Sequence, residues 1–431
     1  MNIGGPSLHV YYLTEGLRKD RFESHLVVGK VSHLEGSMED LFSGPWRPLT
    51  TIPELRREIN VRRDLIAFFK LLRIIRSKKP HIVHTHMSKA GYLARLAVVF
   101  LRVFGRRRIL AVHTFHGNVF SGYFSPWKSK LFLLIERMLA RFTDAIIAIS
   151  EGQRRDLVHR FRVAGPDKIR MIRLGFDLEP FLSNDALKGR FRERLGMGVD
   201  QRLVGIVGRL VPVKNHRLFL EAVRQLKEAD PGDQTRFVVV GDGMLRGELE
   251  NLVRDLEVAD RVIFSGWQRE MASVYADLDL LCLTSINEGT PVAVIEAMAS
   301  GVPVAATDVG GGPDLLGPVV GSSGEALYAV CERGLMCRRG DPESVAWAIR
   351  DVILGAVPEL DRCVMRARLY VAQYYSRGRL VEDVENLYES LLEGCGRAGK
   401  AKRDRLKRVL TGLECDRGVG GIIRCLINGW A

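Results

Sequence analysis

The chain has 431 residues, which is enough for about two or three domains that each bury a core. Hydrophobic residues make up 46% and charged residues 27%, as in an ordinary globular protein, and no apolar run reaches the roughly 18 residues of a membrane span. Because no basic segment followed by an apolar one opens the chain, we expect a cytoplasmic protein.

The net charge and the cysteines limit the kinds of binding partner and of cysteine site that we expect. A formal net charge of +13 would attract nucleic acid, an anionic membrane surface or a phosphorylated substrate. No zinc-finger spacing or RNA-binding signature accompanies the charge, so nucleic acid is not expected. All seven cysteines lie at or after Cys282 without a CxxC pair, which predicts idle thiols rather than disulfides or a metal site.

Short apolar runs rich in β-branched residues alternate with helical stretches, as in doubly wound parallel sheets. Several runs are continuously apolar, as parallel strands covered on both faces are. The strands expected in chain order are His25–Val28, His81–His86, Arg108–His113, Ala145–Ser150, Ile169–Leu174, Leu203–Val207, Phe237–Val240, Val262–Phe264, Leu278–Leu283 and Pro303–Thr307.

These strands form two arrays separated by a polar connector at Ser183–Asp200. We therefore expect a first Rossmann-like domain over residues 1–182 and a second over 183–375. A helix over 376–393 should follow and pack back on the first domain. The basic run and the glycines beyond it predict a poorly ordered tail over 394–431.

A basic amphipathic helix is expected at Glu58–Lys79, where apolar residues recur at helical spacing and Arg and Lys mostly occupy the other side. This pattern fits a core helix with a solvated basic face. It also fits a helix that rests on anionic lipid, which would suit a membrane-bound substrate.

Two glycine-rich turns could bind anions. Gly4-Gly5 precedes a helical segment, and Gly241-Asp242-Gly243 follows the strand RFVVV. Backbone amides at the start of a helix make an anion cradle, although a tight turn between strand and helix would leave the same pattern. The third glycine of GDGMLRG comes one residue late for a dinucleotide fingerprint, so NAD is not expected.

Cations and carboxylates follow the strands of the second array. Arg209 and Lys214 come after the strand LVGIVG, where they could neutralise a diphosphate without a metal or could simply be solvated. Glu288 precedes a helix that contains Glu296, and the apolar neighbours of Glu296 imply that it has partners. One carboxylate could accept hydrogen bonds from a ribose while the other faces a sugar, and amides near Gly289, Thr290 and Pro291 would meet a phosphate.

The segment EGTPVAVIEAMASGVPVAATDVGG closely resembles the nucleotide-sugar signature of the family 4 retaining glycosyltransferases, and GRLVPVKN, VVVGDG, HTHMSKAG and HTFHG follow the family's order. The resemblance covers Ile3 to about Leu392 and implies a GT-B fold, in which two Rossmann-like domains face each other across a cleft.

The resemblance also implies roles for individual residues. Glu296 would bind the donor ribose, and Glu288 would contact the transferred sugar near its anomeric carbon. Arg209 and Lys214 would hold the diphosphate. His116 would lie beside the reacting sugar across the cleft, and Gly4-Gly5 would approach the donor phosphate or the acceptor.

Other kinds of site remain open. His84, His86, His113 and His116 all lie near strand ends and invite a zinc hypothesis, but no acidic or cysteine ligand lies nearby in the sequence and the family implies no metal or cofactor. The two glutamates could be the acid and the nucleophile of a glycosidase, although the phosphate-binding context argues against that.

The chain departs from its family at both ends. Relatives begin with a strand that leads into the glycine pair, whereas only Met1-Asn2-Ile3 precede it here. We therefore expect the central first strand of the first domain to be missing, because the start is placed too late or the copy is truncated. Glu414–Ala431 lies outside the resemblance and is consistent with a shifted reading frame.

The expected function is transfer of a sugar, with retention of anomeric configuration, from a nucleotide-diphosphate donor to a glycan or lipid-linked acceptor. UDP is the commonest donor base in such enzymes, and the charge suggests a peripheral membrane contact, as in bacterial polysaccharide assembly. The alternatives are a sugar epimerase or phosphorylase on the same fold and a truncated, inactive relative.

Overall fold

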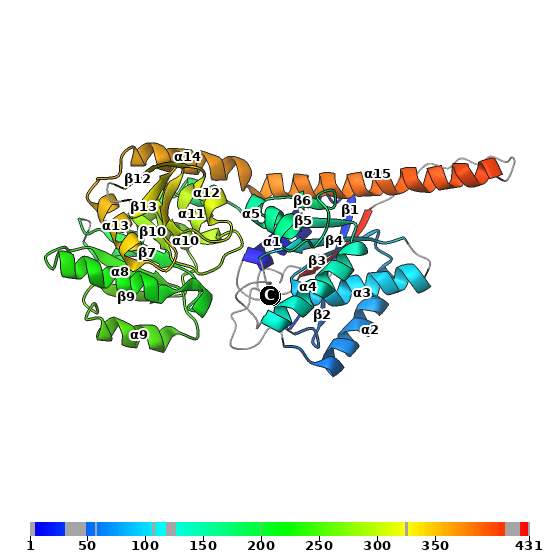
Figure 1. The fold of residues 1–431 in the computed structure, drawn as a ribbon, viewed down its shortest axis with the longest axis horizontal. Helices are drawn as coiled ribbons and strands as arrows, with labels where there is room; N and C mark the ends of the chain where they lie inside the picture. The colour runs from blue at the N-terminus through cyan, green and yellow to red at the C-terminus, as the bar shows by residue number, and fades with distance from the viewer. Residues whose placement is uncertain are drawn as a thin grey trace. The chain divides into compact units, whose positions relative to one another are not determined.

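The computed structural model describes residues 5–30, 49–56, 58–105, 108–117, 126–198, 200–323, 326–409 and 423–429. The chain forms two compact units (Figure 1). The first unit comprises Met1–Phe176 and Arg377–Ala431, and the second comprises Asp177–Ser376. Each unit is built on a mainly parallel sheet with helices, and all ten strands that the sequence predicts are present.

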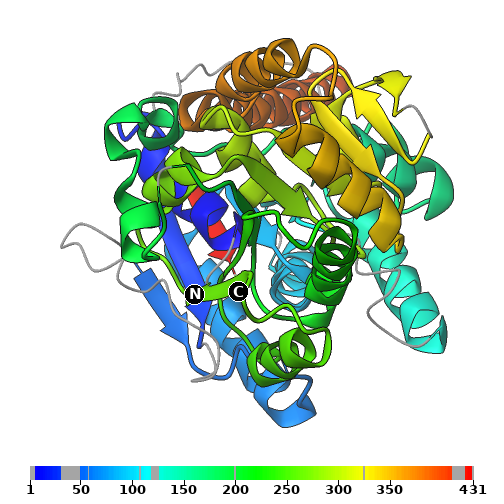
Figure 2. The same cartoon turned by 90° about the vertical axis from the view of Figure 1, so that its left-hand side faces the viewer.

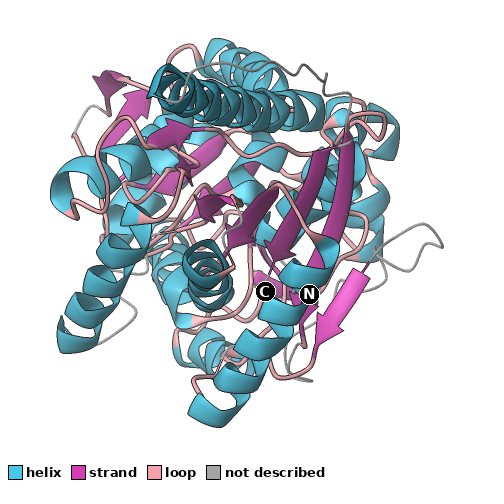
Figure 3. Ribbon diagram, turned by 90° about the vertical axis from the view of Figure 1, so that its right-hand side faces the viewer, coloured by secondary structure: helices cyan, strands magenta, loops and turns pink. Residues whose placement is uncertain are grey.

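The first unit contains a parallel sheet in the order β2-β1-β15-β3-β4-β5-β6, and Figure 3 shows its strands side by side among helices. Its strands are β1 (Phe22–Gly29), β2 (Leu49–Ile52), β3 (Ile82–His86), β4 (Leu110–Phe115), β5 (Ala145–Ala148), β6 (Ile169–Met171) and β15 (Ile423–Gly429). Its helices include α1 (Gly5–Gly16), α2 (Val61–Lys78), α3 (Ser88–Phe104), α4 (Pro126–Arg141), α5 (Glu151–Arg155) and α15 (Arg377–Val409).

The centre of this sheet differs from the sequence-based expectation. Strand β15 lies between β1 and β3, at the position where the sequence analysis places the first strand of this domain. Residues 394–409 continue the helix α15, and 423–429 form a strand, where a poorly ordered tail is expected. The sequence around this segment did not indicate the arrangement, because the partners of β15 are hundreds of residues away along the chain and no local pattern reveals them.

Alternating side chains of the central strands supply two cores. Leu26 and Val28 of β1 pack with residues of α1 and α15, whereas Val27 between them packs with residues of α2 and α3. Because successive side chains of a strand point to opposite faces, a strand covered on both faces must be apolar throughout. This arrangement explains the continuous apolar runs in the sequence.

The second unit has the sheet order β12-β13-β14-β11-β10-β7-β8-β9, in which β12, β13 and β14 form an antiparallel extension that the sequence analysis missed. Its strands are β7 (Leu203–Val207), β8 (Arg236–Val240), β9 (Val262–Gly266), β10 (Leu280–Leu283), β11 (Val304–Thr307), β12 (Val319–Ser322), β13 (Tyr328–Cys331) and β14 (Gly334–Cys337).

In Figure 2, the green and the yellow-to-orange helices of the second unit lie around its strands. The helices are α6 (Glu179–Leu182), α7 (Arg190–Arg194), α8 (His216–Ala229), α9 (Arg246–Asp255), α10 (Met271–Asp277), α11 (Val292–Ala299), α12 (Gly312–Leu316), α13 (Pro342–Ile353) and α14 (Leu360–Tyr374).

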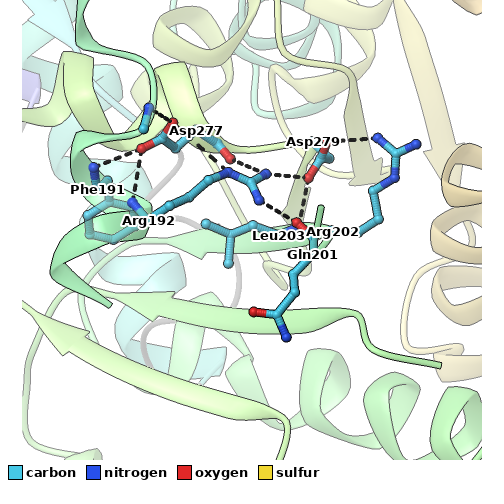
Figure 4. A network of polar contacts seen from close by, with 8 residues as sticks. Phe191, Arg192, Gln201, Arg202, Leu203, Asp277 and Asp279 are labelled. Carbon is cyan, nitrogen blue, oxygen red and sulfur yellow. Dashed lines mark hydrogen bonds and ion pairs between the residues drawn. The ribbon is translucent and has the colours of Figure 1, made fainter. Parts of the chain in front are cut away.

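A buried carboxylate fixes the polar connector that precedes β7 (Figure 4). Asp277 is fully buried and accepts hydrogen bonds from the backbone amides of Gly189, Phe191 and Arg192 at 2.5, 2.7 and 3.0 Å. The Arg192 guanidinium donates to Asp279 at 2.7 Å, and Asp279 also accepts from the backbone amide of Leu203 at 2.7 Å. The network therefore ties α7 to the amino ends of β7 and β10.

Replacement of Asp277 with Ala should destabilise the second unit by about 2–3 kcal/mol, because three amides lose a charged acceptor in a buried place. The free energy of unfolding can be measured by urea denaturation. Asp260→Ala is a matched control, since Asp260 is 59% exposed and pairs with Lys227 at the surface. Equal unfolding midpoints for the two variants would contradict a structural role for Asp277.

Candidate functional site

The topology of the second unit predicts where a ligand binds. From the central strand β7 the chain proceeds to β8 and β9 on one side and then to β10 and β11 on the other. In open parallel sheets, ligands bind beyond the carboxyl ends of the strands at such a switch point. The loops that follow β7 and β10 meet at this position.

An ion pair joins these two loops. The Nζ atom of Lys214, after β7, lies 2.5 Å from Oε1 of Glu288, after β10. The same carboxylate oxygen accepts a hydrogen bond from the Ser285 hydroxyl at 2.6 Å. Both charged side chains are largely buried, with 23% of Lys214 and 10% of Glu288 exposed, while Arg209 is exposed. The structure thus brings together two residues that the sequence places 74 positions apart.

Glycines allow neighbouring loops to approach this ion pair closely. Gly241 has φ of +127°, and a Cβ atom there would lie 2.1 Å from the carbonyl oxygen of Gly208. The carbonyl of Asp242 accepts a hydrogen bond from the Leu210 amide at 3.0 Å, and the Asp242 carboxylate accepts one from the Gly243 amide at 2.7 Å. The GDG turn therefore packs against the loop that carries Arg209 and Lys214.

A second glycine pair was not singled out by the sequence analysis. Gly310 has φ of +57°, and a Cβ atom there would lie 1.9 Å from the carbonyl oxygen of Glu288. The Gly311 amide donates to the Gly289 carbonyl at 2.7 Å. A run of three glycines that begins three residues after the end of β11 was the available signal, because side chains at Gly310 and Gly311 would prevent this loop from supporting Glu288.

Glu296 lies on α11, the helix that follows the Glu288 loop. The hydroxyl of Tyr275, a residue that sequence reasoning missed, donates to its Oε2 atom at 3.0 Å. Burial raises the pKa of the Glu296 carboxyl to about 7, although the hydrogen bond from Tyr275 opposes that rise. Buried Thr290 and Pro291 lead into the first turn of α11, which begins at Val292.

The first unit carries a cluster of histidines at the carboxyl ends of its strands. His84 is held by Tyr388 and Thr114 at 2.6 and 2.7 Å, whereas Nδ1 of His86 lies 3.0 Å from Nε2 of His116. The ring of His9 on α1 lies edge-on to His86 and His116, at centroid distances of 5.3 and 5.0 Å. Gly5 begins α1, while Gly4 lies outside the described residues.

Burial keeps these imidazoles neutral. It lowers the pKa of His84 and of His116 to about 3, and it lowers that of His9 and of His86 well below the usual value. Within the described residues, both ring nitrogens of His9, Nε2 of His86 and Nδ1 of His116 lack a hydrogen-bond partner.

The ligand atoms of His9, His86 and His116 lie within 4.8 Å of one another. Neutral nitrogens in this arrangement can hydrogen-bond sugar hydroxyls, and their spacing also admits a transition-metal ion.

Known families and proteins resemble the chain along most of its length. The model of Glycosyltransferase Family 4 matches residues 3–180, and that of Glycosyl transferases group 1 matches residues 188–370. The UDP-Gal:alpha-D-GlcNAc-diphosphoundecaprenol alpha-1,3-galactosyltransferase of Escherichia coli is 29% identical over 69% of this chain and 74% of that protein. The putative glycosyltransferase EpsD of Bacillus subtilis is 28% identical over 79% of this chain and 84% of its own.

Solved structures support the fold. Anabaena HepE, crystallised in complex with UDP-glucose, superimposes with a TM-score of 0.71 at 20% sequence identity, covering 90% of this chain and 97% of its own. Its likeness agrees with two Rossmann-like sheets of the GT-B type, as the sequence predicts. The two matching family models and the fold establish that this chain is a glycosyltransferase enzyme and belongs to glycosyltransferase family 4.

Proposed function

We propose that the second unit binds a nucleotide-diphosphate sugar and that the enzyme transfers the sugar, with retention of anomeric configuration, to a glycan or lipid-linked acceptor. The observation that carries this proposal is the Lys214–Glu288 ion pair at the switch point of the sheet. It places a cation for a leaving diphosphate next to a carboxylate that can face the sugar.

The proposed reaction relies on position and charge. The bond between the anomeric carbon and the phosphate oxygen breaks while the acceptor oxygen bonds to the same face of the sugar. The acceptor proton passes to an oxygen of the departing phosphate. Arg209 and Lys214 stabilise the negative charge that grows on the diphosphate, and no metal is required. His116, being neutral, hydrogen-bonds a sugar hydroxyl rather than delivering a proton.

The donor nucleotide is proposed to be UDP. HepE was crystallised with UDP-glucose, and the Escherichia coli relative is named as a UDP-Gal enzyme. That relative's acceptor is named as a diphosphoundecaprenol-linked GlcNAc, which supports a lipid-linked acceptor here. The proposed ribose contact is Glu296, with amides of Gly289 and Thr290 and the GDG turn near the phosphates.

A thermal-shift panel tests the donor site. At 100 times its dissociation constant, a ligand stabilises the fold by about 2.7 kcal/mol, so a true donor should raise the melting temperature measurably. We expect UDP and one UDP-sugar to do so, whereas GDP and ADP do not, and Glu296→Ala should reduce the shift. A folded sample that responds to no nucleotide would favour an inactive relative, and product formed without an acceptor would favour an epimerase or phosphorylase.

We further propose that the first unit contacts an anionic membrane through α2, α3 and α4. Among the described residues, no helix is long and apolar enough to cross a bilayer. Helix α3 nevertheless packs against both α2 and α4, and the latter contact includes the buried Arg95–Glu136 pair at 2.7 Å. Large apolar side chains are exposed on all three helices: Val61, Leu65, Ile66, Phe69, Phe100, Val103, Phe104, Trp127, Leu131, Leu134 and Met138.

Exposed basic side chains also lie on or next to these helices. Exposed examples on α2 and α4 and just after α2 are Arg62, Arg63, Arg73, Arg76, Lys78, Lys79, Lys128, Lys130, Arg137 and Arg141. Each basic residue near an anionic bilayer contributes about 1 kcal/mol, and apolar groups that enter the interface add to this. A surface contact of this kind would bring the enzyme to a lipid-linked acceptor at the inner face of the membrane.

The double variant Trp127→Gln/Leu134→Gln should weaken binding to vesicles that contain phosphatidylglycerol at least about tenfold, because two exposed anchors are lost. Vesicle co-sedimentation measures this, and salt should weaken the wild type further. Met365→Gln/Leu369→Gln is the matched control, since these α14 residues are 64% and 65% exposed in the second unit. The proposed membrane contact would be contradicted if both double variants bound these vesicles equally well. It would also be contradicted if the wild type bound neutral vesicles as tightly as anionic ones.

A further inference from the structure

Three histidines of the first unit converge, although they come from distant parts of the chain. His9 lies on α1, His86 ends β3, and His116 directly follows β4. One ligand nitrogen from each ring lies within 4.8 Å of the other two. Two of the histidines that the sequence analysis considered for zinc therefore belong to this cluster. Its third member, His9, carried no signal in the sequence.

The other two histidines of the zinc hypothesis, His84 and His113, lie outside the cluster. Both ring nitrogens of His84 have hydrogen-bond partners, Tyr388 and Thr114, at 2.6 and 2.7 Å. The ring of His113 lies against α3 instead, where a Cβ atom on Gly91 would lie 2.6 Å from its Cε1 atom. The candidate ligands are therefore the three converging histidines alone.

The cluster holds polar atoms without partners in a buried place. His9 and His86 are 1% and 0% exposed. Within the part of the chain that the structure describes, both ring nitrogens of His9, Nε2 of His86 and Nδ1 of His116 have no hydrogen-bond partner. A buried polar group left unpaired costs about 1–3 kcal/mol, so the cluster is suited to a ligand that uses these nitrogens.

The spacing of the nitrogens suits a tetrahedral metal ion. Bonds of about 2.0–2.1 Å hold two imidazole nitrogens on zinc about 3.4 Å apart. Nδ1 of His86 and Nε2 of His116 already lie 3.0 Å apart. The hydrogen between them can move to the outer nitrogen of its own ring, so both rings can ligate an ion without net loss of a proton. A small rotation of the His9 side chain completes the set.

The donor atoms select the kind of ion. All three are imidazole nitrogens, and no carboxylate or thiolate joins them among the described residues. Mg²⁺ and Ca²⁺ prefer oxygen ligands, whereas imidazole suits late first-row ions such as Zn²⁺. Three protein ligands leave the fourth position of zinc to water. His116 is partly exposed and marks the side from which an ion can enter.

We propose that His9, His86 and His116 form a binding site for Zn²⁺, and that the bound ion inhibits the enzyme. The inhibition rests on the proposed function, in which His116 hydrogen-bonds a hydroxyl of the transferred sugar. A nitrogen that ligates zinc has no lone pair left for that hydroxyl, and the ion with its water takes up the adjoining space. The binding of zinc itself depends on neither donor nor acceptor.

Zinc binding is measured on the metal-free full chain by competition with a chromophoric chelator, with Mg²⁺ as the comparison ion. We expect one zinc ion per chain and no competition by Mg²⁺. His9→Gln and His116→Gln should each weaken binding at least about tenfold, because one of three ligands is lost. His159→Gln, at an exposed position of the same unit, is the matched control and should bind zinc like the wild type.

A second measurement uses the wild type alone, so it does not depend on the folding of a variant. Co²⁺ bound in place of zinc should show the intense visible absorption of a tetrahedral site. A weak octahedral spectrum, or equal zinc affinity in the wild type and in the His9 and His116 variants, would contradict the site.

Turnover with and without zinc tests the inhibition, with each variant compared with its own metal-free rate. Saturating zinc should lower the turnover of the wild type at least about tenfold, because it displaces the sugar from its position, and a chelator should restore it. His9→Gln should need more zinc for the same effect. Zinc that binds without inhibiting would refute the inhibitory role. A metal-free wild type that transfers no sugar would overturn the proposed function and with it the inhibition, but not the binding of zinc.

Discussion

Replacement of Lys214 with Ala is expected to lower turnover by about 100- to 1,000-fold, which corresponds to about 2.7–4 kcal/mol of lost transition-state stabilisation. The negative charge on the leaving diphosphate grows as its bond to the sugar breaks. A cation beside it therefore interacts more strongly with the transition state than with the bound donor, and the loss should fall on kcat more than on donor affinity. Steady-state kinetics together with calorimetric titration of UDP-glucose separate the two effects.

Two further variants serve as controls for this result. Lys214→Arg keeps the positive charge and should retain much more activity than the alanine variant. Lys227→Ala removes a lysine of the same unit that pairs with Asp260 at 2.7 Å on the surface, and it should leave turnover unchanged. A Lys214→Ala enzyme with weakened donor binding but normal kcat would show that the ammonium only anchors the donor. In that case another residue would have to stabilise the negative charge on the leaving diphosphate.

Donor affinity is expected to fall about tenfold between about pH 8 and about pH 6, because the Glu296 carboxyl titrates in this range. Its pKa is raised to about 7, so lowering the pH protonates it and removes the charged acceptor proposed for the ribose hydroxyls. UDP-glucose is the suitable ligand, since its phosphates stay ionised throughout the range whereas the terminal phosphate of UDP does not. Calorimetric titration at several pH values measures the dependence.

Glu296→Gln should remove this pH dependence, and Glu296→Ala should weaken donor binding about 10- to 100-fold, in line with about 1.5–3 kcal/mol for a hydrogen bond to a charged group. Tyr275→Phe should lower affinity less, because it removes a group that orients the carboxylate. Glu343→Gln, at an exposed position on α13, serves as the matched control. A pH dependence that survives in Glu296→Gln would assign the titration to a different group.

The sequence by itself determined the alternating architecture, and it pointed to the loop and helix of the candidate site. Apolar runs such as Leu203–Val207 and Phe237–Val240 identify buried parallel strands locally, because both faces of such a strand must be apolar. The spacing of Glu288 and Glu296 marked the loop and helix where the candidate site lies. Local periodicity also found the basic helix α2, although not the apolar side chains exposed on α3 and α4.

Only the tertiary structure decided which distant residues meet. Lys214 and Glu288 are 74 positions apart, and Tyr275 and Glu296 are 21 apart, so their contacts depend on how β7, β10 and α11 are assembled. The same holds for β15, which pairs with strands near the other end of the chain. Periodicity and turn signals report on a few neighbouring residues, whereas the pairing of strands is decided by backbone hydrogen bonds between distant segments. The residues around β15 therefore do not reveal that this strand lies inside the first sheet.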